Sequence, residues 1–346
     1  MHKRAADYGI QVGSLPRGAG NQITDVPGVT VGHCTVDTPR HKTGVTVVIP
    51  GTQNPFHHFV PAAAYVLNGF GKSTGLVQVE ELGTLEGPVA LTNTLNVGKV
   101  QDALVEYLCW RGESIGLHPT TVNAVVLECN DGGLNDIRHR AVGQNEVYAA
   151  LEDASDSFEE GAVGAGMGMV CHGLKGGIGS ASRLLTIDGV TYTMGILMLT
   201  NHGKLSDLTI DGKNIGAVLA QRLPQDEGPD KGSCVAVIAT DLPLDARQLG
   251  RVARRASVGL ARLGSYIGQG SGEIFLAFST ANSFNPQEKA AVRPTLSFHE
   301  DLMDLPFRAV AECAEEAILN SLFAAHTVTG FNGKTVTALP DLWPVE

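Results

Sequence analysis

Residues 231–282 carry the clearest hydrophobic pattern in the chain. An apolar run from Cys234 to Ala239 follows Gly232 and Ser233, and the polar segment 223–231, rich in breaker residues, comes before them. A short apolar run bounded by glycine and proline is typical of a buried strand. The pattern therefore predicts that Ser233 lies where a flexible loop enters the core.

A helix and a second strand follow this run. Asp245 can cap a helix that ends at Gly264, because apolar side chains recur between them at helical spacing and the arginines fall elsewhere. The next apolar strand, 274–280, is preceded by Ser271 and Glu273. Residues two apart in a strand point to the same side, so these two side chains can face one site together.

Similar patterns predict further elements along the rest of the chain. Alternating or continuous apolar runs indicate strands, and apolar residues three or four apart indicate helices. We expect strands at 24–33, 43–50, 88–93, 122–128, 191–201 and 334–340, and helices from Val97 to Gly112, after Asn145, and from Leu305 to about His326 with Asp304 as a possible cap.

Several polar residues in these elements allow more than one interpretation. Glu312, Glu315 and Glu316 are interpreted as a solvated face of the last helix rather than as catalytic acids. His33 is expected to be packed or hydrogen-bonded rather than a ligand. Asn201 comes at the end of a strand, where asparagine is usually a turn residue.

Residues 161–180 contain eight glycines. A phosphate-binding loop is one interpretation, but the strand–turn–helix context of G-x-G-x-x-G is missing and Lys175 lacks the spacing of a Walker loop. Glycines also permit positive φ and close backbone approach. We therefore favour a packed loop beside an active site over nucleotide binding.

Composition and charge narrow the possible partners and compartment. The chain has 346 residues, of which 43% are hydrophobic, and its net charge of −11 argues against nucleic acid as a partner. The six cysteines show no metal-binding spacing, and the N-terminal sequence does not resemble a secretory leader, so reduced buried thiols are expected. The apolar runs are too short to span a membrane. We expect a soluble cytoplasmic protein.

Several motifs, spread over about three hundred residues, follow one another in a characteristic order. They include NQITDVPGVTVGH (21–33), ECNDGGLNDI (128–137), the glycine-rich segment 161–183, LTNHG (199–203), GS-x6-TD-x-PL from Gly232, and GSGE (270–273). Each motif alone is weak, but their order and spacing are specific. Together they resemble the family of L-aminopeptidase/D-Ala-esterase/amidase (DmpA) and the β-aminopeptidases (BapA).

The resemblance implies a fold and an assembly. The fold would be an α/β four-layer αββα sandwich, similar to that of N-terminal-nucleophile hydrolases but with a different strand connectivity. Residues 1–346 would form a single catalytic domain that cleaves itself between Gly232 and Ser233. The products, 1–232 and 233–346, would remain paired, and the pairs would assemble into a homo-oligomer.

Self-cleavage would also explain how a serine becomes reactive. A serine hydroxyl inside a chain is a weak nucleophile without a neighbouring base. On this hypothesis the Ser233 hydroxyl attacks the Gly232 carbonyl, the acyl group shifts from nitrogen to oxygen, and water hydrolyses the ester. The new α-amine has a pKa of roughly 7.7–8.0, so it can act as the base for peptide hydrolysis.

The resemblance assigns roles to the other residues of the site. Asn201 would donate to the oxyanion, while Ser271 and Glu273 would orient the Ser233 ammonium. Neither a metal nor an organic cofactor is expected. Cys234 is intrinsically the better nucleophile, but adjacent strand residues point to opposite faces, so Ser233 is preferred.

Two departures from the family pattern concern the substrate. Asn130 and Gly133 stand where the family's aminopeptidases have a tyrosine and a bulky aromatic residue, so both are candidate substrate-binding positions. The expected substrate is a short peptide, amide or ester with a free N-terminus. Two other functions stay open: an amidohydrolase or acyltransferase acting on a pantetheine-like or oligoamide substrate, and an unprocessed binding or scaffold homologue.

Overall fold

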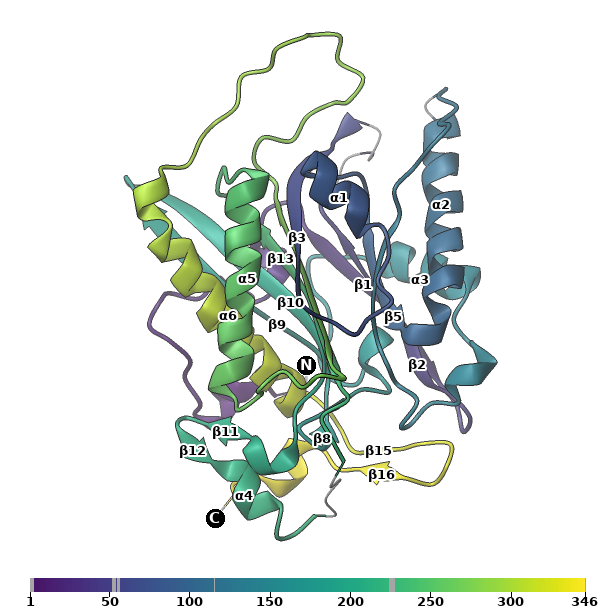
Figure 1. The fold of residues 1–346 in the computed structure, drawn as a ribbon, viewed down its shortest axis with the longest axis vertical. Coiled ribbons are helices and arrows are strands. Elements are labelled where there is room, and N and C mark those ends of the chain that lie inside the picture. The colour runs from purple at the N-terminus through teal and green to yellow at the C-terminus, as the bar shows by residue number, and fades with distance from the viewer. Residues whose placement is uncertain (1–2, 52–53, 55–56, 115, 224–227, 346) are drawn as a thin grey trace.

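The computed structural model describes residues 3–51, 54, 57–114, 116–223 and 228–345. Two β-sheets stack face to face, with helices on the outer side of each (Figure 1). Of the expected loop 223–231, residues 224–227 lie outside the described residues. The first sheet has the order β1-β2-β5-β6, formed by β1 (Thr30–Asp37), β2 (Lys42–Ile49), β5 (Val89–Asn93) and β6 (Val125–Cys129).

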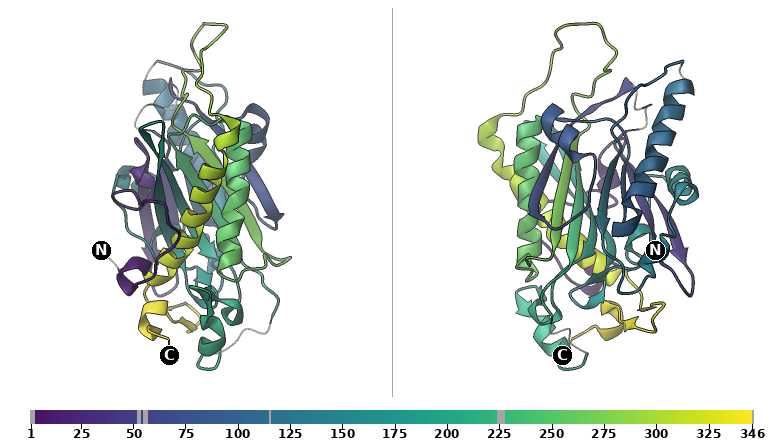
Figure 2. Two further views of the ribbon diagram at one scale, coloured as in Figure 1. Left: turned by 90° about the vertical axis from the view of Figure 1, so that its left-hand side faces the viewer. Right: turned by 45° about the vertical axis from the view of Figure 1, so that its right-hand side comes forward.

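The second sheet has six strands and holds the centre of the molecule. Its order is β4-β3-β14-β13-β10-β9. Figure 2 shows both sheets between the two helical layers. The strands of this sheet are β4 (Thr84–Leu85), β3 (Val60–Gly69), β14 (Gly272–Ser279), β13 (Ser233–Thr240), β10 (Val190–Asn201) and β9 (Gly177–Ile187).

Helices cover the outer faces of both sheets. α2 (Val97–Ser114) and α3 (Gln144–Asp153) pack on the four-stranded sheet. The six-stranded sheet is covered by α5 (Ala246–Arg262) and α6 (Asp304–Phe323). The remaining helices are α1 (Leu76–Leu82), beside β3, and α4 (Ile215–Leu219).

Alternation along β13 explains why it fits at the centre. Val235, Val237 and Ala239 belong to the apolar core between the two sheets. Cys234, Ala236 and Ile238 belong to the core under α5 and α6. Both faces of the strand are therefore buried, which is why the sequence shows an unbroken apolar run instead of an alternating one.

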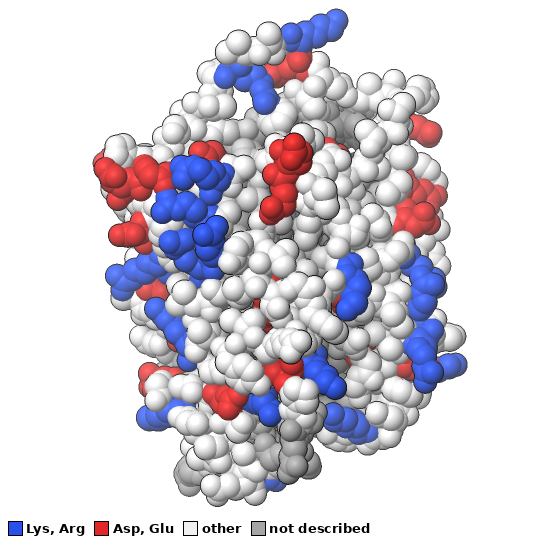
Figure 3. Space-filling model, viewed as in Figure 1, with Lys and Arg blue, Asp and Glu red and all other residues white. Residues whose placement is uncertain are grey.

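The predicted strand–helix–strand unit forms β13, α5 and β14. The two strands are parallel and adjacent, as a helical crossover requires. The Asp245 side chain accepts a hydrogen bond from the Gln248 backbone N–H at 2.7 Å and caps α5 as expected. Figure 3 shows basic side chains gathered over this helix. Three of them lie over aromatic rings, Arg251 and Arg255 over Phe307 and Arg254 over Tyr65.

The last helix corrects two expectations. Asp304 is the first residue of α6 rather than its cap, and the N-cap residue, Met303, makes no side-chain capping bond. Glu312 and Glu316 are buried rather than solvated, because both pair with the fully buried Arg183 of β9 at 3.1 and 2.7 Å. Only Glu315 lies near the surface, where it pairs with Arg262.

Several other elements differ from the expectation. The segment 334–340 contributes only the two-residue strand β16 (Thr335–Val336), which pairs with β15 (Val328–Thr329). Strands β3 and β9 were not predicted. β9 resembles a glycine-rich loop in sequence because Gly179 lies against α6, where a Cβ would come within 1.8 Å of the Ala317 carbonyl oxygen. Within the described residues, no helix is long and apolar enough to cross a membrane.

Candidate active site

Ser233 begins the central strand of the six-stranded sheet. It pairs with Asn201 of β10 on one side and with Gly272 of β14 on the other. The residue is 5% exposed, and its Oγ makes no hydrogen bond among the described residues. Burial raises the pKa of the neighbouring Cys129 thiol well above its usual value, and the Ser233 hydroxyl partly offsets that rise. A buried hydroxyl without a firm partner is uncommon and marks a reactive or ligand-binding position.

Cys234 faces away from this position. It lies in the core under α5 and α6, whereas the next residue along, Val235, lies between the sheets on the Ser233 side. Burial raises the pKa of the Cys234 thiol well above its usual value. The structure therefore agrees with the expectation that the two side chains point to opposite faces, and it leaves Cys234 as an inert core thiol.

Hydrogen bonds hold both backbone polar groups of Gly232, the residue before Ser233. The Gly232 carbonyl accepts a hydrogen bond from the Gly272 N–H at 3.2 Å, and the Gly232 N–H donates to Asp230 Oδ1 at 3.3 Å. A Cβ on Gly232 would lie 2.3 Å from the Asn201 carbonyl oxygen, so a larger residue would displace the strand end. Glycine is thus required here by close backbone approach.

Asn201 is the last residue of β10, and its side-chain amide is fixed by two hydrogen bonds. Oδ1 accepts from the Val170 N–H at 2.9 Å, and Nδ2 donates to the Asn130 carbonyl at 3.0 Å. Because Val170 N can only donate, the orientation of the amide is determined. Nδ2 carries two hydrogens and uses one here, which leaves a second donor for an oxyanion.

Ser271 and Glu273 meet at the entrance to β14, as the alternation predicts. The Ser271 hydroxyl donates to Glu273 Oε1, and Oε2 is buried without a partner among the described residues. Burial raises the pKa of Glu273 to about 7; the hydrogen bond from Ser271 lowers it, and the charge of Asp230 raises it. The Glu273 carboxyl group therefore has one oxygen that can pair with a cation.

The orientation of Glu273 refines one expectation. Its register partner is Cys234, so its side chain lies on the helix-covered face, opposite the Ser233 hydroxyl. The backbone nitrogen of Ser233 lies in the plane of the sheet and is accessible from either face. This arrangement suits a carboxylate that contacts the α-amine of Ser233 but not its hydroxyl.

The two candidate substrate-binding residues lie in the loop after β6. Asn130 is exposed, and its backbone carbonyl rather than its side chain contacts Asn201. Gly133 is also exposed, and a Cβ there would meet nothing within 4 Å. The loop therefore leaves open space beside Gly133.

The glycine-rich segment packs beside the site and does not form a phosphate loop. It holds β7 (Val170–Cys171) and β8 (Leu174–Lys175) and leads into a strand instead of a helix. Lys175 is fully buried, and its amine donates to the carbonyls of Gly166, Met169 and Gly176 at 2.7–2.9 Å. The interpretation as a packed loop agrees with this geometry. His33 is likewise packed, against Thr46 and the Glu159 carbonyl.

Sequence reasoning missed Asp230, Cys129 and Val170. Asp230 is 6% exposed and contacts the Gly232 N–H, but in the sequence it is one acid in a polar loop. Cys129 and Val170 come close to Ser233 and Asn201 only through the stacking of sheet and loop. A sequence pattern carries no signal for such contacts.

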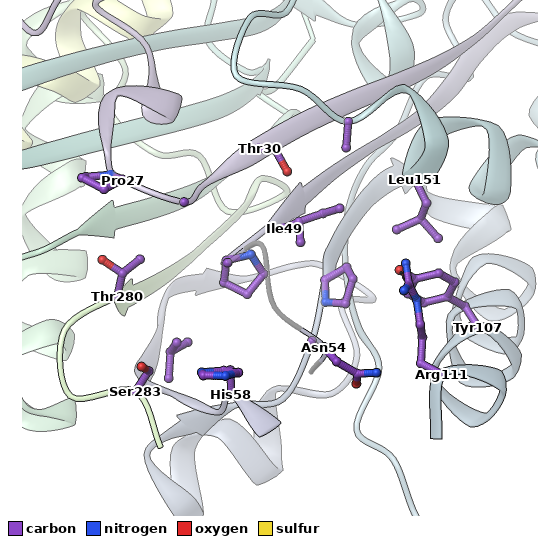
Figure 4. A pocket seen from close by; sticks show the side chains of 17 residues that line it. Pro27, Thr30, Ile49, Asn54, His58, Tyr107, Arg111, Leu151, Thr280 and Ser283 are labelled. Carbon is purple, nitrogen blue, oxygen red and sulfur yellow. Dashed lines mark hydrogen bonds between the residues drawn. The ribbon is translucent and has the colours of Figure 1, made fainter. Parts of the chain in front are cut away.

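A separate pocket of about 450 Å³ lies between the sheets and α2, near Tyr107, Arg111 and Thr280 (Figure 4). Thr280 follows the far end of β14, whose eight residues span roughly 25 Å at about 3.3 Å each. This pocket therefore does not belong to the site around Ser233.

Comparison with known proteins places this site in a family. Residues 21–336 match peptidase family S58. The β-peptidyl aminopeptidase BapA of Sphingosinicella microcystinivorans is 38% identical, over 97% of this chain and 89% of the relative. A crystal structure of a Pyrococcus horikoshii OT3 protein superposes with a TM-score of 0.93 at 45% identity, covering 99% of this chain and 98% of that one.

A third relative also bears on the fold. It is the L-aminopeptidase D-Ala-esterase/amidase of Ochrobactrum anthropi, described as a prototype for the serine aminopeptidases and a new variant of the Ntn-hydrolase fold. It superposes with a TM-score of 0.90 at 36% identity, covering 97% of this chain and 95% of that one. The expected fold class and the family resemblance are thereby confirmed. The chain therefore belongs to peptidase family S58 and is a hydrolase of the serine aminopeptidase type.

Proposed function

We propose that the chain cleaves itself between Gly232 and Ser233 and then acts as an aminopeptidase or amidase with Ser233 as its nucleophile. The observation that carries this proposal is the Ser233 hydroxyl, which is buried at a strand entrance without a hydrogen-bond partner among the described residues and follows a glycine that the backbone requires. Membership of a family of serine aminopeptidases supports it.

Self-cleavage follows from the arrangement around Gly232. The Ser233 Oγ adds to the Gly232 carbonyl carbon, and the Gly272 N–H bonded to that carbonyl stabilises the developing negative charge. The carbon–nitrogen bond then breaks, and the hydroxyl proton passes to the Ser233 nitrogen, which becomes a free amine. Water hydrolyses the resulting ester, leaving a carboxylate on Gly232 and restoring the Ser233 hydroxyl.

Substrate hydrolysis uses the groups that cleavage leaves behind. The neutral α-amine of Ser233 takes the proton from Oγ as it attacks the substrate carbonyl, and later returns a proton to the leaving amine. Asn201 offers its second Nδ2 hydrogen to the oxyanion. Glu273, with Ser271 beside it, holds the amine in place from the opposite face of the sheet.

The names of two relatives indicate the class of substrate. One is named a β-peptidyl aminopeptidase and another an L-aminopeptidase and D-Ala-esterase/amidase. We infer that this chain removes N-terminal residues from short peptides, amides or esters with a free N-terminus. The open space at Gly133 favours substrates with a larger first side chain than an aromatic wall would admit. We also infer that the processed pairs form a homo-oligomer.

A panel of matched substrates tests this proposal. Each α- or β-dipeptide amide is offered with a free amine and, as its control, with an N-acetyl group. We expect release of the first residue only from the free-amine series, with no turnover in Ser233→Ala and wild-type turnover in the exposed control Ser206→Ala. Equal hydrolysis of both series would make the chain an amidase of another specificity.

A further inference from the structure

Three potential metal ligands meet beside the candidate active site. Cys171 ends β7, His172 follows it directly, and His202 comes directly after Asn201 at the end of β10. One sulfur or nitrogen atom of each lies within 4.8 Å of the others, and Cys171 Sγ is 4.0 Å from His202 Nδ1. All three side chains are at most 1% exposed.

Two ring nitrogens of this cluster are unsatisfied. Nε2 of His172 and Nε2 of His202 are both buried without a hydrogen-bond partner among the described residues. The two rings pack edge to face, with their centroids 5.4 Å apart. Buried polar atoms are nearly always paired, so two such nitrogens in adjoining side chains indicate a ligand.

A hydrogen bond to the Lys204 carbonyl orients the His172 ring for binding a metal. Its Nδ1 lies 3.0 Å from the Lys204 carbonyl, which can only accept, so Nδ1 carries the hydrogen and Nε2 presents a lone pair. A histidine whose other nitrogen donates to a carbonyl is the common arrangement in metal sites.

The donor atoms of this cluster suit a zinc-type cation. One thiolate and two imidazoles are ligands that Zn²⁺ or a similar borderline cation prefers, whereas Ca²⁺ and Mg²⁺ take oxygen ligands. Three protein ligands leave the fourth tetrahedral position for a water molecule.

We propose that Cys171, His172 and His202 bind one Zn²⁺-type cation. In a tetrahedral site the sulfur and nitrogen ligands lie on the order of 3.5 Å apart, so the side chains need to draw together by about 1 Å. Binding displaces the Cys171 thiol proton to solvent. The bound ion joins β7 to the end of β10, and so it fixes the backbone on which Asn201 stands.

Cobalt spectroscopy tests the site independently of catalysis. All three ligands lie before Ser233, so the assay uses the purified chain whether or not it is cleaved. After chelator treatment and desalting, Co²⁺ is titrated in and then displaced by Zn²⁺. We expect one equivalent per chain, with the visible bands of tetrahedral cobalt and a thiolate-to-metal charge-transfer band.

Substitutions of a proposed ligand and of a control cysteine test where the ion binds. Cys171→Ser should abolish the charge-transfer band and weaken Zn²⁺ binding by roughly 100-fold or more. Cys171→Ala serves as a second variant if the serine is not tolerated in the core, and circular dichroism checks the fold of each. Cys313→Ser, a buried cysteine of α6 outside the cluster, should leave binding unchanged. Failure of the wild-type chain to bind, or an unchanged band in Cys171→Ser or Cys171→Ala, would overturn the proposal.

Discussion

At the scale of single residues, the candidate site contains buried polar groups that keep unused hydrogen-bonding capacity. Ser233 Oγ and Glu273 Oε2 have no partners among the described residues, and Asn201 keeps one free donor hydrogen. The buried cations Arg183 and Lys175, by comparison, are paired and hold the fold.

The amide of Asn201 provides the first prediction. Asn201→Ala should lower kcat by roughly 10²–10³, because the substitution removes a donor that acts on the oxyanion. Since it also breaks the bonds to Val170 and Asn130, a modest loss of stability, about 1 kcal/mol for each bond, should accompany the kinetic effect. Steady-state kinetics with urea unfolding measures both; a rise in KM alone would make Asn201 a substrate-positioning residue.

Glu273 provides a prediction about pH. In the uncleaved chain its pKa is about 7 instead of 4.5, so between these values the folded state binds a proton that the unfolded state has lost. Stability therefore falls as pH rises across this window. In an uncleaved Ser233→Ala background, Glu273→Gln should remove this fall. The melting temperature of the double variant, measured relative to that of Ser233→Ala, should therefore increase between pH 4.5 and pH 8.

Cleavage should reverse the role of this carboxyl group. Next to the new ammonium, ionised Glu273 raises the pKa of the amine, because an opposite charge favours the charged form. In the processed enzyme, Glu273→Gln should therefore move the acidic limb of the kcat/KM profile down by about one pH unit. A melting difference independent of pH, together with an unshifted profile, would remove Glu273 from the mechanism.

At the scale of elements, the strand–helix–strand unit of β13, α5 and β14 could be predicted because each part carries its own signal. The apolar run, the Asp245 cap and the paired Ser271 and Glu273 are all local in sequence. β9 could not be predicted from local sequence. Its glycines suggest a loop, but Gly179 is needed for close contact with α6, which is distant in the sequence. The roles of Glu312 and Glu316 were hidden for the same reason, since Arg183 is distant in sequence.

The ion-pair group between β9 and α6 gives a prediction for stability. Glu312 is held by the backbone N–H groups of Ser14 and Leu15 as well as by Arg183 and Arg308. Glu312→Gln should destabilise the fold by roughly 3–5 kcal/mol, because it leaves part of the buried Arg183 charge uncompensated. Glu315→Gln on the same helix, which breaks a partly exposed pair, should cost less than about 1 kcal/mol. Equal losses in urea unfolding would contradict the buried role of Glu312.

At the scale of the whole molecule, the proposed cleavage point divides the fold without separating its parts. β13 and β14 would belong to the second fragment, yet they lie between β3 and β10 of the first. α6 of the second fragment packs on β9 of the first. The fragments share the core on both faces of the sheet, so they should stay together after cleavage and separate only when the chain unfolds.

The most direct test of the central claim is the intact mass of the purified protein under denaturing conditions, compared with its mass under native conditions. We predict two denatured species, one ending at Gly232 and one beginning with a free Ser233 amine, whose masses sum to the 36.3 kDa chain plus one water, and a native species that contains both. Ser233→Ala should give a single 36.3 kDa species without hydrolytic activity. An uncleaved wild-type chain with full aminopeptidase activity would contradict the account.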